Sequence, residues 1–176
     1  MTKLFLSLHV LAAVLAVGPV TVAASMFPKA LRRAREAPAD REAYASLRLL
    51  HRICRVYAVV GVAVPVSGFV TASSLGVLGS AWLITSMILT AAAAAVLALL
   101  ILPAQDRELA EVRPPGGGAE AGTGAEPEEE AQAGAGVLVT ARRSAGRLAM
   151  HTGIFNLLWA TVTVLMIVRP GSTTGA

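Results

Sequence analysis

Long stretches without a charged residue constrain this chain more than any other feature of its sequence. Residues 4–28, 56–105 and 148–168, which are 25, 50 and 21 residues long, contain no Asp, Glu, Lys or Arg. A helix needs about 20 apolar residues to cross the hydrocarbon core of a bilayer. The three stretches therefore have room for one, two and one membrane-spanning helices, and we predict four spans.

The composition agrees with a membrane protein. Only 15% of the 176 residues are charged and 55% are hydrophobic, with a mean hydropathy of +0.66, whereas soluble domains usually carry about a quarter charged residues. The net charge of +4 does not indicate nucleic-acid binding, because the basic residues border apolar spans. We predict an all-α fold: a single transmembrane four-helix bundle over residues 1–176, with spans at about 4–27, 56–71, 81–102 and 148–168.

The segment between the first two spans, residues 29–55, is predicted to be basic and helical. Pro28 is expected to open a short helix over 29–36, because proline suits the first turn of a helix and disrupts the interior. Asp40 is a suitable N-cap for a longer helix that continues into the second span. Pro65 is expected to kink that helix within the membrane.

The third span is predicted to stop at Pro103. Beyond it, residues 114–136 consist almost entirely of Gly, Ala, Glu and Pro. Such a segment cannot bury enough apolar surface to offset the entropy lost on ordering. We therefore predict a disordered loop between the third and fourth helices. Its acidic run, residues 126–130, is either a solvated spacer or docks onto the basic helix of the first loop.

The basic residues also predict the orientation in the membrane. Of the 15 Lys and Arg residues, 13 lie within 29–55 or 107–147, and basic residues near span ends stay on the cytoplasmic side. We predict that loops 28–55 and 103–147 are cytoplasmic and that both termini are outside. Arginine outnumbers lysine 13 to 2, a bias typical of GC-rich bacterial genomes, so we expect the plasma membrane of a bacterium.

The first apolar stretch has an alternative interpretation as a signal peptide. Lys3 precedes an apolar core, and residues 22–24, Val-Ala-Ala, fit a cleavage pattern. However, four basic residues follow the stretch within residues 29–35 and only Lys3 precedes it. This balance favours holding the downstream flank in the cytoplasm, so we expect the first helix to be retained.

Histidines are the residues most able to carry chemistry in this chain. His9 lies inside the first span, on the same helical face as Ala12, Ala13 and Ala16. It should therefore point at neighbouring helices. An ionisable side chain in that position commonly marks a functional site, so we treat His9 as a candidate site residue. The alternative is a neutral histidine that forms a hydrogen bond between helices.

His51 and His151 both lie near the cytoplasmic ends of their predicted helices. Two imidazoles on facing helices at one depth can hold a haem iron axially or contribute to a copper site. Alternatively, both are interfacial residues near lipid headgroups. Arg48, Arg52 and Arg55 lie on the same helix as His51, and we expect them to bind anionic phosphates of the bilayer.

The remaining polar residues of the spans favour packing over catalysis. Asn156 is expected to bond to a neighbouring helix, because polar side chains commonly join helices in lipid. No carboxylate lies inside any predicted span, and the sequence contains no phosphate-binding loop, metalloprotease histidine pair or nucleophile elbow. No residue pattern in the sequence indicates an enzyme.

Several short motifs resemble a family of predicted bacterial four-span membrane proteins, with actinobacterial members the most similar. They are residues 8–18 (LHVLAAVLAVG), 101–105 (ILPAQ), 156–159 (NLLW) and 165–171 (LMIVRPG). The histidine of the first helix, followed by a glycine, also resembles copper-resistance D-type and protoporphyrinogen-oxidase-like membrane proteins. That second resemblance implies haem or copper handling, with His9 as the position that carries over.

Three functions follow from these observations. The first is a non-enzymatic accessory or interaction component of the plasma membrane, without a cofactor, that binds a protein partner or further copies of itself. The second is a small redox or metal-handling protein that binds haem b or copper through His9, His51 or His151. The third is a minimal transporter that works as an oligomer.

Overall fold

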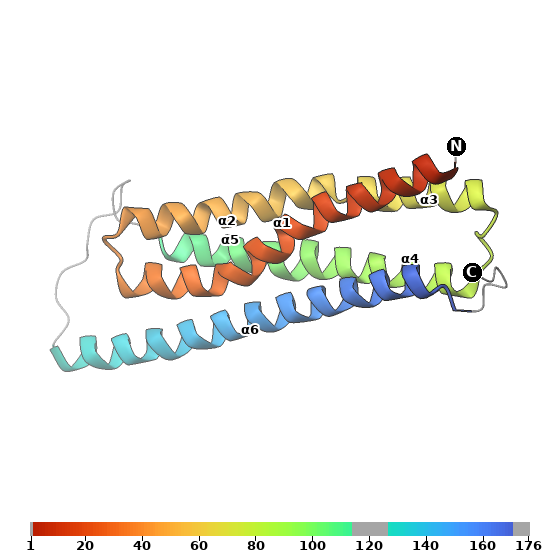
Figure 1. Ribbon diagram of the computed structural model, residues 1–176. Helices are drawn as coiled ribbons and strands as arrows, with labels where there is room; N and C mark the ends of the chain where they lie inside the picture. The colour runs from red at the N-terminus through yellow and green to blue at the C-terminus, as the bar shows by residue number, and fades with distance from the viewer. Residues whose placement is uncertain (1, 114–126, 171–176) are drawn as a thin grey trace.

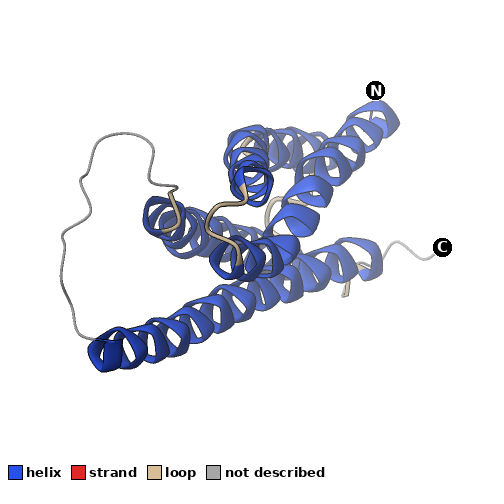
Figure 2. Cartoon of the chain, turned by 90° about the vertical axis from the view of Figure 1, so that its left-hand side faces the viewer, coloured by secondary structure: helices blue, strands red, loops and turns tan. Residues whose placement is uncertain are grey.

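The computed structural model describes residues 2–113 and 127–170, and this part of the chain is helical without any strand (Figure 2). The elements are α1 (Thr2–Glu36), α2 (Arg41–Val60), α3 (Ala63–Leu75), α4 (Ala81–Ala95), the π-helix η1 (Val96–Ile101), α5 (Leu102–Glu111) and α6 (Pro127–Val168).

Four helices are long and apolar enough to cross a membrane, which confirms the predicted all-α fold with four spans. They cover Lys3–Glu36, Arg41–Leu75, Ala81–Glu111 and Arg143–Val168. The start of α1, the α3–α4 turn and the end of α6 lie at one end of the bundle (Figure 1). The α1–α2 turn, the end of α5 and the start of α6 lie at the opposite end, which we call the basic end. It comprises residues 28–55, 102–113 and 127–147.

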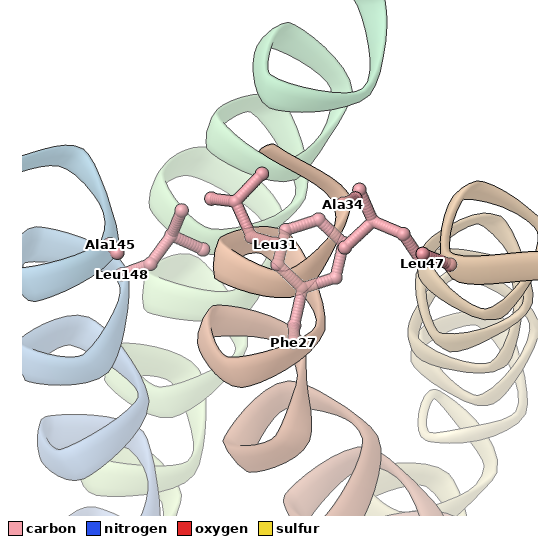
Figure 3. Packing of buried hydrophobic residues seen from close by; sticks show 7 residues of the cluster. Phe27, Leu31, Ala34, Leu47, Ala145 and Leu148 are labelled. Carbon is pink, nitrogen blue, oxygen red and sulfur yellow. The ribbon is translucent and has the colours of Figure 1, made fainter. Parts of the chain in front are cut away.

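The helix α1 lies in the middle of the bundle. It packs along α2 and α3 on one side and along α6 on the other, while α4 packs along α6 and α5 packs on α2. Figure 3 shows this arrangement at the basic end, where buried side chains of α1 lie between α2 and α6. This core cluster includes Phe27, Leu31, Ala34, Leu47, Ala145 and Leu148.

The first helix continues through Pro28, so the predicted separate helix over 29–36 is wrong. Both Pro19 and Pro28 lie inside α1. A proline removes one backbone hydrogen bond, but Phe27 and Leu31 on either side of Pro28 are fully buried in the core cluster. Their burial stabilises the helix across the proline. The prediction for Asp40 is confirmed, because its carboxylate accepts from the backbone N–H groups of the next helix at 2.9 and 3.1 Å.

The second span is interrupted at Gly61–Val62, four residues before the proline expected to kink it. Pro65 has no N–H to donate to the carbonyl of Gly61, its partner in a regular helix. The N–H of Val64 donates to that carbonyl instead, at 3.1 Å. The tighter turn ends α2 and starts α3.

The third span does not stop at Pro103, so that prediction is wrong. The chain passes from α4 through η1 into α5 and remains helical to Glu111. In a π-helix each N–H reaches the carbonyl five residues back, and Leu102 bonds to Leu97 in this way. This wider spacing accommodates a proline that cannot supply the usual N–H.

The last part of the segment predicted as a loop, residues 127–136, belongs to α6, which begins at Pro127. Residues 114–126 lie outside the described residues. Proline suits the first position of a helix because its missing N–H would have no partner there. Alanine, the residue with the highest helix propensity, recurs over the next turns.

Candidate functional site

Buried polar side chains gather at the basic end, where α5 meets its neighbours. Gln105 is completely buried, and His51 and Glu108 are each 7% exposed. A buried polar group destabilises a protein unless it has a partner. Each of these three side chains contacts another polar side chain, and together the contacts form two clusters one helical turn apart on α5.

The first cluster joins α2 to α5 through His51. Nδ1 of His51 lies 3.0 Å from Oε1 of Gln105, and the amide nitrogen of Gln105 donates to Sγ of Cys54 at 3.7 Å. On the other side of the ring, Nε2 lies 3.0 Å from a carboxylate oxygen of Asp106, although the geometry of this contact is not that of a hydrogen bond. Both ring nitrogens therefore face oxygen atoms of α5, and a metal ion could bind only by displacing one of them.

The second cluster joins α1, α5 and α6 through Arg35. Its guanidinium pairs with Glu108 and Glu111 of α5, the latter at 3.1 Å, and donates to Oγ of Ser144 at 3.2 Å. Charge-assisted hydrogen bonds of this kind are the strong ones in proteins. The Arg35 cluster therefore ties three helices together in the region where they leave the apolar part of the bundle.

Arg35, Gln105 and Glu108 are not among the site residues predicted from the sequence. Because the helix was predicted to stop at Pro103, no interior-facing polar residue was expected beyond it. One signal was available: Gln105 and Glu108 are three residues apart, the spacing of one helical face.

His9 lies against α3, on the helical face predicted for it. Nδ1 of His9 is 3.1 Å from Oγ of Ser67, and that hydroxyl donates to the carbonyl of Val64 at 3.1 Å. The hydroxyl oxygen therefore accepts from the imidazole. The ring also lies directly against Gly68, since a Cβ added to that glycine would come within 2.9 Å of Cε1 of His9. This arrangement is a close helix–helix contact with a polar bond inside it.

The other predicted site residues are not brought together with these clusters by any contact. Nδ1 of His151 is buried and has no hydrogen-bond partner among the described residues. Asn156 donates to Oγ of Ser25 at 3.4 Å, a bond between α6 and α1. Three basic residues expected near lipid headgroups are exposed on α2: Arg48, Arg52 and Arg55.

The headgroup contact of these arginines stays a prediction. His51 is buried against α5 and is not exposed at the surface of the bundle. Within residues 2–113 and 127–170, no group of three or more His, Cys, Asp or Glu side chains is arranged to hold a metal ion. What the site does chemically is to lock four helices at fixed positions through hydrogen bonds and ion pairs.

Comparison with known proteins gives one match. The family model described as "Predicted integral membrane protein (DUF2269)" matches residues 3–115, more than half of the chain. No curated protein and no solved structure matches the chain. The matched region contains the first three spans and the polar helix α5. It also contains His51 on α2 and His9, which contacts α3. The protein is thus a multi-pass integral membrane protein, and it belongs to the family of predicted integral membrane proteins DUF2269.

Proposed function

We propose that the protein is a non-enzymatic accessory component of a bacterial plasma membrane, and that its basic end is the surface that binds a cytoplasmic protein partner. The observation that carries the proposal is the rigid extension of the helices at this end. With 35 residues, α1 is about 52 Å long, whereas the hydrocarbon core is about 30 Å thick. Residues 28–36 of α1, about 13 Å of its length, belong to the basic end.

This extension has the construction of a folded interaction surface. Its interior is the core cluster of α1, α2 and α6, and the Arg35 cluster fixes α5 beside them. Its exterior carries many exposed basic side chains: Lys29, Arg32, Arg33, Arg41, Arg48, Arg52, Arg55, Arg107, Arg113, Arg143 and Arg147. Those nearest the membrane suit anionic headgroups, and those nearest the α1–α2 turn suit an acidic partner surface.

The experiment is co-purification of the full chain from its native membrane in mild detergent. Arg32→Gln together with Arg41→Gln removes two exposed charges near the α1–α2 turn. The matched control, Lys3→Gln together with Arg169→Gln, removes two charges from the opposite end. We expect a stoichiometric partner that is lost at least tenfold in the first variant and retained in the control. Recovery of the bare protein at native expression, or equal loss in both variants, would overturn the proposal.

Binding of haem b or copper is the second candidate, and His151 is the observation that favours it. Its buried Nδ1 has no partner in the described part of the chain, so its lone pair or its proton is available. An absorption spectrum and metal analysis of the purified protein test this function. A Soret band or stoichiometric copper that disappears in His151→Ala would establish it, and a colourless, metal-free protein would remove it.

A further inference from the structure

The helix α2 packs along α1 and α5 and leaves one of its faces exposed. Arg48, Arg52 and Arg55 lie on this face, and all three are exposed. They follow one another at intervals of four and three residues, which places them within about 60° around the helix axis. The three residues therefore form a single row about 10 Å long, which we call the α2 arginine row.

The α2 arginine row has no counter-ion in the part of the chain whose side chains are described, residues 3–113 and 143–170. No ion pair there includes any of its three arginines. The sequence contains no Asp or Glu between Glu42 and Asp106, and Asp106 lies against His51, on the side of α2 that faces α5. Three positive charges at this spacing repel one another unless an anion lies among them.

The row ends where the apolar part of the second span begins. Residues 56–75 follow Arg55 directly, contain no charged residue and measure about 30 Å along a helix, which equals the thickness of the hydrocarbon core. Arg55 therefore marks the boundary of the core. Arg52 and Arg48 lie about 5 and 10 Å beyond Arg55, and the headgroup layer is about 5 to 8 Å thick. Because long arginine side chains extend along a helix toward the interface, all three guanidiniums can reach the lipid phosphates.

Exposed apolar side chains adjoin the arginines on the same face of α2. Leu49, one turn before Arg52, is 58% exposed, and Val59, one turn after Arg55, is 72% exposed. Val56 lies between these two positions and is also exposed. The surface is therefore apolar toward the core and cationic at the level of the headgroups. A free anion gains nothing from the apolar side chains, whereas a phospholipid contacts both parts of this surface.

We propose that the α2 arginine row is a binding site for an anionic phospholipid, whose phosphate lies among the three guanidiniums and whose acyl chains cover Val56 and Val59. The headgroup carries a net negative charge, because the ammonium group of a zwitterionic lipid would be repelled by the same guanidiniums. Arginine suits this role since its planar guanidinium binds phosphate oxygens in pairs. The site refines the role of the basic end, but it needs no protein partner and does not include Arg32 or Arg41.

Native mass spectrometry of the delipidated full chain tests this site. The probes are dioleoyl phosphatidylglycerol, which is anionic, and dioleoyl phosphatidylcholine, which is zwitterionic and has the same acyl chains. We expect phosphatidylglycerol to bind at least tenfold more tightly, and a large excess of inorganic phosphate should not displace it. Equal affinities for the two lipids would overturn the proposal. Displacement by inorganic phosphate would show that the row binds a free anion, which also overturns it.

Two matched double variants locate the site. Arg52→Gln together with Arg55→Gln should weaken the binding of phosphatidylglycerol at least tenfold, because each arginine near an anionic surface contributes about 1 kcal/mol. Arg32→Gln together with Arg41→Gln removes the same charge near the α1–α2 turn and should leave the affinity unchanged. All four side chains are exposed, so neither variant removes a buried contact. Equal losses in both variants would reflect net charge alone and contradict the proposal. The protein partner is tested at Arg32 and Arg41, so either proposal can fail while the other stands.

Discussion

Arg35 pairs with Glu108 across the basic end of the bundle, although 73 residues separate them in the sequence. Both side chains are largely buried, with exposed fractions of 16% and 9%. The same guanidinium bonds Glu111 and Ser144, so a single side chain of α1 fixes the positions of α5 and α6. The pair therefore determines how the helices are held together at the basic end.

Removing the charge of Glu108 should be far more damaging than removing that of Glu111. Glu108→Gln leaves a largely buried guanidinium without its main counter-ion, and we expect a loss of about 3 kcal/mol in the free energy of unfolding. The side chain of Glu111 is 67% exposed, so Glu111→Gln should cost about 0.5 kcal/mol or less. Unfolding of the purified protein by titration with SDS measures both, and equal losses would contradict the role given to Glu108.

Gly68 should not tolerate a methyl group. Gly68→Ala places a Cβ within 2.9 Å of the His9 ring, which must move away from Ser67, and we expect a loss of about 2 kcal/mol. The matched control is Gly153→Ala, because nothing lies within 4 Å of its added Cβ. There the higher helix propensity of alanine should give a gain of up to about 1 kcal/mol.

A double-mutant cycle separates this contact from a general effect on α3. Once His9→Ala has removed the ring, adding Gly68→Ala should cost less than it does in the native chain. If the two losses are additive, the two residues are not in energetic contact, and the contact does not stabilise the fold.

Two buried threonines should respond differently to valine. The hydroxyl of Thr71 donates to the carbonyls of Ser67 and Phe5, at 2.8 and 3.2 Å, and the second bond joins α3 to α1. Thr71→Val should therefore cost about 1 kcal/mol. The hydroxyl of Thr152, a residue only 3% exposed, has no partner among the described residues. Thr152→Val should be neutral or stabilising in the same SDS titration.

The proposed orientation can be tested by single cysteines at the two ends of the bundle. Ala39 lies in the α1–α2 turn and Gly79 in the α3–α4 turn, and both are exposed. In a chain with Cys54→Ala, an impermeant maleimide added to intact cells should label Gly79→Cys and not Ala39→Cys. The reverse pattern would place the basic end outside and contradict the positive-inside argument.

The number and type of the helices were predictable because they depend on hydrophobicity alone. A run without charges as long as residues 56–105 is explained by spans and by little else. The cap at Asp40 was predictable for a similar reason, since its bonds reach only two and three residues along the chain. Local chemistry of this kind is visible in the sequence.

The course of the helices at prolines was not predictable, because it depends on packing far from the proline. Pro28 is accommodated in α1 because Phe27 and Leu31 are buried against other helices. Pro103 is accommodated because the π-helix η1 widens the turn before it. The polar clusters were missed for the same reason. The partners of Arg35 lie 73 to 109 residues away in the sequence, and no local sequence pattern predicts contacts at that separation.

The π-helix η1 also decides which way α5 faces. Along this helix the buried residues Ala93, Leu97, Ile101 and Gln105 follow one another at intervals of four. In a regular helix each interval of four overshoots a full turn by about 40°, so three intervals would carry the buried side about a third of the way around the axis. The wider turns of η1 cancel this drift. Deleting one residue from η1 would therefore rotate α5 about its axis relative to α4. The helix α4 would keep its place beside α6, while Gln105 and Glu108 would turn out of the bundle together. His51 would lose Gln105 and Arg35 would lose Glu108 in a single event.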